Sequence, residues 1–192
     1  MYPVFLKLAG RRVLLVGGGT VASGKLEGLL REGASVTVVA PHIRPEMERP
    51  GVAFHRRAFQ EADLDDVWWV VAAAPPAVNR EVSAAAERRR LFVNAVDDPQ
   101  HASAYLGGVV RRDGVTIAVS TDGRAPALSA LLREGLDAWL PSDLAAWMSA
   151  ADDARRSWKT EGVPMNERRP LLLQALNRLY GARGRSDPGA EP

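Results

Sequence analysis

Residues 17–19 are three consecutive glycines, and together with Ala22 they form the pattern G-x-G-x-x-A. In this pattern the first glycine allows a tight turn, the second allows the backbone to approach a pyrophosphate, and the small last residue allows close helix packing. Free N–H groups at the start of the following helix can bind phosphate oxygens. The pattern predicts a dinucleotide-binding turn, with a purely structural glycine turn as the alternative. The predicted cofactor-binding residues of the turn are Gly17, Gly19, Thr20 and Val21.

A strand must precede this turn and a helix must follow it for the pattern to bind a dinucleotide. Residues 12–16 (RVLLV) form a short apolar run that predicts a buried strand. Residues 20–32 carry apolar residues at helical spacing and end before Gly33, a typical helix C-cap. Residues 35–39 (SVTVV) predict a second strand. The three elements fit within about 30 residues, which is the length of a βαβ unit.

The second predicted strand does not end in the acidic residue that commonly binds the ribose hydroxyls of NAD. It continues as Ala40-Pro41-His42-Ile43-Arg44. Backbone groups or His42 would have to contact the ribose, and Pro41 and His42 are predicted cofactor-binding residues. Arg44 could accept the 2′-phosphate of NADP, so the residues leave the choice between NAD and NADP open.

Alternating strands and helices continue to about residue 96. Further strands are predicted at residues 52–55, 67–72 and 91–96, and a helix at residues 77–90. This alternation predicts an α/β fold, a Rossmann-like parallel sheet with helices on both faces. Trp68 and Trp69 are expected in one strand, facing opposite covered faces of the sheet.

The pattern changes after about residue 100. Residues 109–112 and 115–120 predict a hairpin whose tight turn is Asp113-Gly114. Helices are predicted at residues 126–140, 142–159 and 166–181, the last two with Ser142 and Asn166 as N-caps. The hairpin and one amphipathic helix cannot bury their apolar faces alone, which predicts a dimer interface.

Four regions follow from these elements. They are a Rossmann domain (1–110), a small hairpin-plus-helix dimerisation region (111–141), a C-terminal helical domain (142–181) and a disordered tail (182–192).

The composition limits the classes of function. A net charge of +2 gives no case for a nucleic-acid binder. Without cysteine there can be no disulfide, thiolate catalysis or Cys-ligated metal, and the three scattered histidines predict no metal site. No apolar run approaches the ~20 residues that span a bilayer, and the first residues lack the features of a signal peptide. We therefore expect a soluble, cytoplasmic protein.

Asp97 follows directly after the predicted strand 91–96. Ligands of open α/β sheets bind outside the carboxyl ends of the strands, so this carboxylate is a candidate general base. The alternative is an aspartate that only caps a loop or helix.

Taken together, these motifs resemble the precorrin-2 dehydrogenase family, the dehydrogenase/ferrochelatase module of siroheme synthase. The residues that carry the resemblance are 2–5 (YPVF), 17–22 (GGG-x-VA) with Lys25, 38–41 (VVAP), 93–99 (VNAVDDP) and 117–128 (IAVSTDGRAPAL). The resemblance covers residues 1 to about 140 in the same order and extends more loosely to about 180. It implies the same succession of domains in a homodimer, and oxidation of precorrin-2 to sirohydrochlorin with NAD as cofactor.

The resemblance also implies roles for single residues. Asp97 would take a proton from the substrate while NAD takes a hydride. The substrate is a polycarboxylate, for which arginine is the best-suited cation, and Arg124 is the candidate contact. Ser120 and Thr121 lie in the same turn and are candidate substrate-binding residues, or else bond the backbone of that turn.

Three functions stay open. The first is an NAD-dependent precorrin-2 dehydrogenase, the second a bifunctional enzyme that also inserts ferrous iron, and the third a non-catalytic module that senses NAD. Residues 73–76 (AAPP) depart from the family, which usually has a threonine and acidic residues there. The fused methyltransferase domain of larger relatives has no room in 192 residues, so uroporphyrinogen methylation is not expected.

Overall fold

The structure is a computed structural model that describes residues 1–183. The chain divides into two compact units. The first unit contains residues Met1–Gly107 and Ser120–Pro126, and the second contains Gly108–Val119 and the chain from Ala127 onward. Most of the predicted disordered tail, residues 184–192, lies outside the described residues.

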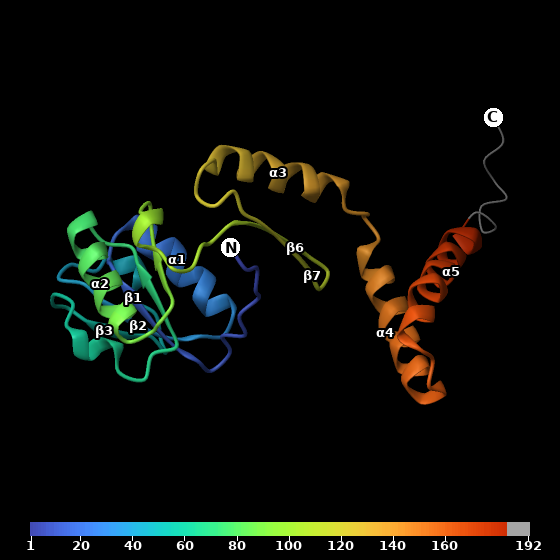
Figure 1. Ribbon diagram of the computed structural model, residues 1–192, viewed down its shortest axis with the longest axis horizontal. Helices are drawn as coiled ribbons and strands as arrows, with labels where there is room; N and C mark the ends of the chain where they lie inside the picture. The colour runs from blue at the N-terminus through green and yellow to red at the C-terminus, as the bar shows by residue number, and fades with distance from the viewer. Residues whose placement is uncertain (184–192) are drawn as a thin grey trace. The chain divides into compact units, whose positions relative to one another are not determined.

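The first unit contains a five-stranded sheet with the order β3-β2-β1-β4-β5, and all its neighbouring strands are parallel. The strands are β1 (Arg12–Val16), β2 (Ser35–Val39), β3 (Ala53–His55), β4 (Trp69–Ala72) and β5 (Val93–Ala95). The helices are α1 (Thr20–Arg31) and α2 (Pro76–Arg88), with short 3-10 turns η1 (Pro45–Met47), η2 (Glu61–Leu64) and η3 (Pro99–His101). The predicted Rossmann-like fold class is therefore confirmed (Figure 1).

Side chains of β1 point alternately to the two faces of the sheet, and one helix packs on each face. Val13 and Leu15 pack in one cluster with Leu26 of α1. Leu14 and Val16 point to the other face and pack with Val82 of α2. The central strands β1 (after Arg12) and β4 are buried on both sides and are apolar, as parallel sheets require, whereas the edge strand β3 is only partly buried.

The prediction that Trp68 and Trp69 both face covered sides of the sheet is wrong for Trp68. The side chain of Trp69 is buried, whereas that of Trp68 is 59% exposed. Trp68 precedes β4 and donates its N–H to the carbonyl of Arg12, the exposed first residue of β1. The guanidinium of Arg11 stacks on the exposed indole, 3.7 Å from the ring centroid.

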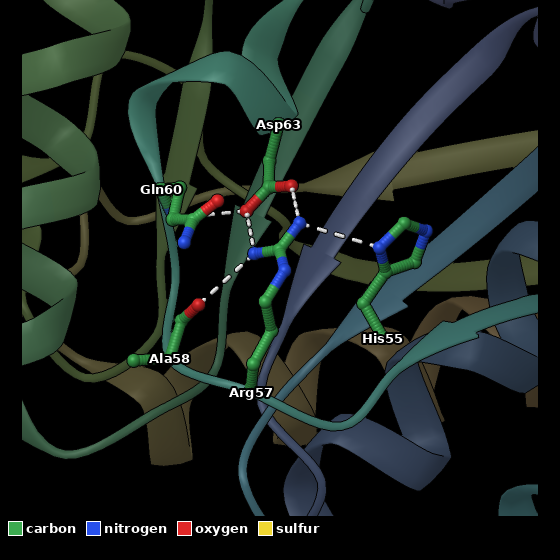
Figure 2. A network of polar contacts seen from close by, with 5 residues as sticks. All are labelled: His55, Arg57, Ala58, Gln60 and Asp63. Atoms are coloured by element: carbon green, nitrogen blue, oxygen red, sulfur yellow. Dashed lines mark hydrogen bonds and ion pairs between the residues drawn. The ribbon is translucent and has the colours of Figure 1, made fainter.

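The connection between β3 and β4 is closed by an ion pair, shown in Figure 2. Arg57 donates from Nη2 to Asp63 Oδ1 (2.5 Å) and from Nη1 to Asp63 Oδ2 (2.8 Å). Burial alone would raise the pKa of Asp63, but hydrogen bonds from Arg57 and from the N–H of Gln60 outweigh it and hold that pKa below its usual value. Arg57 also donates to the carbonyl of Ala58 and contacts the ring of His55, so its side chain connects the end of β3 to the 3-10 turn η2.

In the second unit the predicted hairpin is present. The strands β6 (Gly108–Arg112) and β7 (Val115–Val119) pair antiparallel, and Asp113 and Gly114 take the positive φ values that such a tight turn needs. The helices are α3 (Pro126–Trp139), α4 (Leu144–Glu161) and α5 (Met165–Arg183). Arg112 ties the hairpin to α3, because its Nη2 bonds Asp137 Oδ1 at 2.7 Å and its Nη1 donates to the carbonyl of Leu140.

Both predicted N-caps of the last helices are wrong. Pro141 accepts the N–H of Leu144 in a turn, so α4 has Asp143 and not Ser142 at its cap position. Pro164 accepts the N–H of Glu167, so α5 has already begun before Asn166. The helix α5 continues to Arg183, beyond its predicted end at residue 181. The second unit contains the predicted helical domain and all of the predicted dimerisation region (111–141) except residues Ser120–Pro126, which belong to the first unit. The division at residue 141 stays a prediction.

Candidate functional site

The loops that follow β1, β4 and β5 lie at one edge of the sheet, because the three strands are parallel and adjacent. The register pairs Val16 with Ala72, and Ala72 with Ala95, so the strands end level with one another. The three loops are the glycine turn 17–19, residues 73–75 and the segment that begins at Val96. This is the edge where open α/β sheets bind their ligands.

Two of the three glycines are required by contacts within the protein. Gly17 has a φ of +138°, and a Cβ atom there would lie 2.2 Å from the carbonyl oxygen of Ala73. A Cβ atom at Gly18 would lie 1.9 Å from the carbonyl oxygen of His42. The requirement at Gly18 was missed by sequence reasoning, which treats that position as variable. Ala22 is completely buried, as the predicted close packing of helix and strand demands.

Gly19 differs from its two neighbours. A Cβ atom there would meet nothing within 4 Å, and its φ of −93° is one that any residue adopts. Gly19 is also the N-cap of α1, whose first turn has no side-chain cap and no acidic residue. Open space in front of an uncapped helix N-terminus fits the pyrophosphate of a dinucleotide, so the residues present fit the predicted cofactor.

The predicted residues after β2 lie beside this turn. Pro41 and His42 are exposed, and the carbonyl of His42 faces Gly18. Arg44 donates its N–H to the carbonyl of Gly18 and donates from Nη1 to Oγ1 of Thr20 at 2.6 Å. Arg44 also pairs with Glu46. The guanidinium thus lies at the first residue of α1, within the region expected to hold the cofactor. Val21, the next predicted residue, is exposed at the start of the same helix.

Asp97 lies near the start of the loop that follows β5. Its side chain is exposed and forms no hydrogen bond or ion pair with any residue that the structure describes. Its φ is +57°, in the left-handed region that aspartate and asparagine tolerate better than most residues. Such a carboxylate, at the ligand-binding edge of the sheet, is available to take a proton.

The far end of this loop is bonded back to β5. Ser103 and Ala104 both donate their N–H groups to the carbonyl of Val93, and Ser103 Oγ accepts the N–H of Val93. Asn94 donates from Nδ2 to the carbonyl of Ala104 at 2.9 Å. These bonds give Asn94 a structural role and hold the loop closed.

Asn79 was missed by sequence reasoning. Its Oδ1 accepts the N–H of Ala74 at 2.9 Å, and its Nδ2 donates to the carbonyl of Val96 at 3.3 Å. The signal was present, because Asn79, Val82 and Ala86 share the buried face of α2 at helical spacing. A buried amide at such a position needs polar partners.

His101 contacts Asp98 and not Asp97. The distance from His101 Nδ1 to Asp98 Oδ1 is 2.8 Å, within the 3-10 turn that starts at Pro99. Asp97 therefore keeps its carboxylate available while its neighbour is paired.

The turn that carries the other predicted residues belongs to the first unit. A Cβ atom at Gly123 would lie 3.1 Å from Cβ of Pro99, so the turn packs on the loop that carries Asp97. Ser120 Oγ accepts the N–H of Asp122, and Thr121 Oγ1 accepts the N–H of Ala125. Both hydroxyls bond the backbone of their own turn, whereas Arg124 is exposed on it.

Residues 1–183 contain no group of three or more potential ligands that could hold a metal ion. None of their helices is both long enough and apolar enough to cross a membrane.

Comparison with known proteins gives two family matches. Residues 4–108 match a family described as "Putative NAD(P)-binding", and residues 112–138 match one described as "Sirohaem biosynthesis protein central". The siroheme synthase of Photorhabdus laumondii is 39% identical over 180 residues, which cover 91% of this chain and 38% of the relative. Siroheme synthase 3 of Aeromonas hydrophila is 38% identical over 192 residues, covering 96% of this chain and 41% of the relative. This chain thus spans about two fifths of the length of these curated relatives.

A solved structure also matches over most of its length. The structure described as "SirC, precorrin-2 dehydrogenase" superposes with a TM-score of 0.70 and 27% sequence identity. The match covers 91% of this chain and 88% of the solved chain, so it includes elements of both compact units.

Proposed function

This chain belongs to the NAD(P)-binding family whose match covers residues 4–108, and from that premise we propose that it oxidises precorrin-2 to sirohydrochlorin with NAD+. Two findings support the substrate. The similar solved structure is that of a precorrin-2 dehydrogenase, and the similar curated proteins are siroheme synthases. The observation that carries the proposal is the carboxylate of Asp97, which no described residue pairs, at the same sheet edge as the glycine turn.

The proposed oxidation removes a hydride and a proton from the reduced macrocycle. Bound NAD+ supplies the hydride acceptor. Asp97 takes the proton, since its carboxylate has no partner to displace among the described residues. The uncapped start of α1 and the open space at Gly19 bind the pyrophosphate.

Arg124 has a separate role in this proposal. Its exposed guanidinium binds a carboxylate of the substrate, while the hydroxyls of Ser120 and Thr121 bond the backbone of the turn that presents it. Both hydroxyls then contribute to substrate binding by shaping this turn.

The experiment compares Asp97→Asn with wild type in an anaerobic assay with enzymatically generated precorrin-2 and NAD+. Asparagine suits the left-handed backbone of Asp97 but cannot accept the proton as a carboxylate does. We expect kcat to fall by about 100-fold or more, the range attributed to general-base catalysis. NAD+ binding should be unchanged.

Asp113→Asn is the matched control. Asp113 also has a positive φ, but it lies in the hairpin turn of the second unit, so this variant should keep wild-type activity. An Asp97→Asn variant as active as wild type would contradict the assigned role and favour an NAD-sensing module.

Insertion of ferrous iron is a second candidate activity. It is favoured by the names of the curated relatives, because siroheme is an iron-containing product. Asp97 would accept a pyrrole proton in that reaction as well. Loss of sirohydrochlorin absorption that requires both ferrous iron and this protein would establish the activity.

We also propose that the protein is a homodimer, that its domains divide at residues 110 and 141, and that it is located in the cytoplasm. The dimer is supported by large apolar side chains on α3 that are exposed in the single chain, namely Leu128, Leu131, Leu132 and Trp139.

A further inference from the structure

We propose that Asn79 is a positioning residue for the oxidation, because its side-chain amide connects the loop after β4 to the residue that precedes Asp97. This inference rests on the proposed function. Asn79 itself touches neither substrate nor cofactor and acts through the backbone of Val96.

Both ends of the Asn79 amide bond to loops at the ligand-binding edge of the sheet. Asn79 lies in the first turn of α2 and is only 2% exposed. Its Oδ1 accepts from the N–H of Ala74, in the loop after β4. Its Nδ2 donates to the carbonyl of Val96, in the loop after β5. The amide therefore fixes the two loops relative to each other.

The bond to Val96 bears on Asp97 directly. The N–H of Val96 donates to the carbonyl of Ala72 at 2.9 Å, and its carbonyl accepts from Asn79 at 3.3 Å. Since no described residue bonds the side chain of Asp97, its direction depends on the backbone, which at this residue has a φ of +57°. The peptide group between Val96 and Asp97 is thus held by the amide of Asn79.

The other bond extends this control to the glycine turn. Ala74 follows Ala73, whose carbonyl oxygen occupies the space where Gly17 has no Cβ atom. A shift of residues 73–74 would change that close approach. Asn79 thereby links the general base to the turn expected to bind the cofactor. A displacement of about 1 Å between such groups can cost about 100-fold in rate.

The test compares two Asn79 variants with two controls on α2. Asn79→Ala removes both bonds, and Asn79→Asp keeps an acceptor for Ala74 but places a carboxylate oxygen against the carbonyl of Val96. Val82→Ala leaves a cavity in the same apolar cluster and lowers stability without removing a hydrogen bond of either loop. Ser83→Ala removes a buried hydroxyl that has no hydrogen-bond partner among the described residues.

The measurements are kcat, KM for NAD+ and thermal stability, all at a temperature where every variant is folded. We expect both Asn79 variants to lower kcat by about 10–100-fold while KM for NAD+ changes less than about threefold. Val82→Ala should lower the melting temperature about as much as Asn79→Ala does, but it should retain wild-type kcat. Ser83→Ala should change neither quantity.

The outcomes separate this inference from the proposed function. Active wild type with unchanged kcat in either Asn79 variant would overturn the positioning role alone. That role is also overturned if Val82→Ala loses as much kcat as Asn79→Ala, or if neither Asn79 variant folds, since both results indicate a structural role. A folded wild type that binds NAD+ but does not oxidise precorrin-2 would overturn the proposed function, and the positioning role with it.

Discussion

The three glycines of the turn at residues 17–19 differ in whether contacts within the protein exclude a larger side chain. Gly17 and Gly18 are required by the carbonyl oxygens of Ala73 and His42, whereas no described residue approaches the position of a Cβ atom at Gly19. Gly19 also lies at the uncapped start of α1, on the ligand-binding edge of the sheet, so its missing Cβ atom leaves room where a phosphate would bind. Gly17 and Gly18 are therefore assigned to the stability of the turn, and Gly19 to the binding of the cofactor.

Gly19→Ala should weaken cofactor binding, whereas Gly18→Ala should lower the stability of the fold. Alanine at 19 should leave the melting temperature unchanged and weaken NAD+ binding about tenfold or more, because its methyl group enters the space expected for the pyrophosphate. Alanine at 18 should lower stability by about 1–3 kcal/mol, since its methyl group overlaps the carbonyl of His42. Thermal unfolding and titration of NAD+ fluorescence quenching measure the two effects. Gly19→Ala with wild-type affinity would show that the open space does not receive the cofactor.

Elements of secondary structure were largely predictable, and the exceptions have physical causes. The order of strands and helices and the Asp113-Gly114 turn follow from local patterns, and both are present. Gly33 was predicted as the C-cap of α1; the C-cap is Glu32, and Gly33 is the left-handed residue that follows it. The exposure of Trp68 was not predictable from the apolar run 67–72, because β4 begins one residue later, at Trp69, and Trp68 lies outside it.

At the site, sequence reasoning found the glycine turn and Asp97 but not the contacts that hold them. Gly18 and Asn79 act through residues distant in the sequence, His42 and Val96, so no local pattern marks their partners. The N-caps Ser142 and Asn166 failed for a different reason. Ser142 lies one residue and Asn166 two residues after a proline whose carbonyl accepts a turn hydrogen bond.

An element-scale prediction follows from the Arg57–Asp63 pair that closes the connection between β3 and β4 (Figure 2). Because the pKa of Asp63 is lowered in the folded state, the pair stabilises the fold fully above the pKa of an unfolded aspartate, about 3.9. That contribution is lost as the pH falls through 3.9 and then through the lower folded value. Asp63→Asn should therefore reduce the free energy of unfolding by about 1–3 kcal/mol at pH 7 and by less near pH 3.

Urea unfolding at the two pH values measures this difference. Asp66→Asn is the control, because the Arg12–Asp66 pair is largely exposed and should contribute less than about 1 kcal/mol. Equal destabilisation by Asp63→Asn at both pH values would contradict the assigned ionisation of Asp63.

At the scale of the whole molecule, the proposed dimer rests on the exposed apolar residues of α3. Leu131 is 65% exposed in the single chain, and Leu128, Leu132 and Trp139 lie on the same helix. We expect the protein to be a dimer at micromolar concentration and Leu131→Glu to weaken the dimer. Light scattering coupled to gel filtration gives the mass directly. Leu173→Glu, at a similarly exposed position of α5, should remain dimeric. A wild-type protein that is monomeric in this measurement would refute the dimer.

The whole molecule unites a glycine turn, an available carboxylate and an arginine-bearing turn in its first unit. The most direct test of its proposed function is the anaerobic oxidation of precorrin-2 by purified wild-type protein with NAD+. Sirohydrochlorin and NADH are followed together by visible and near-ultraviolet absorption. We predict that they form in equal amounts, because one hydride and one proton leave each substrate molecule. A folded protein that binds NAD+ yet forms no sirohydrochlorin with either NAD+ or NADP+ would contradict the proposed reaction.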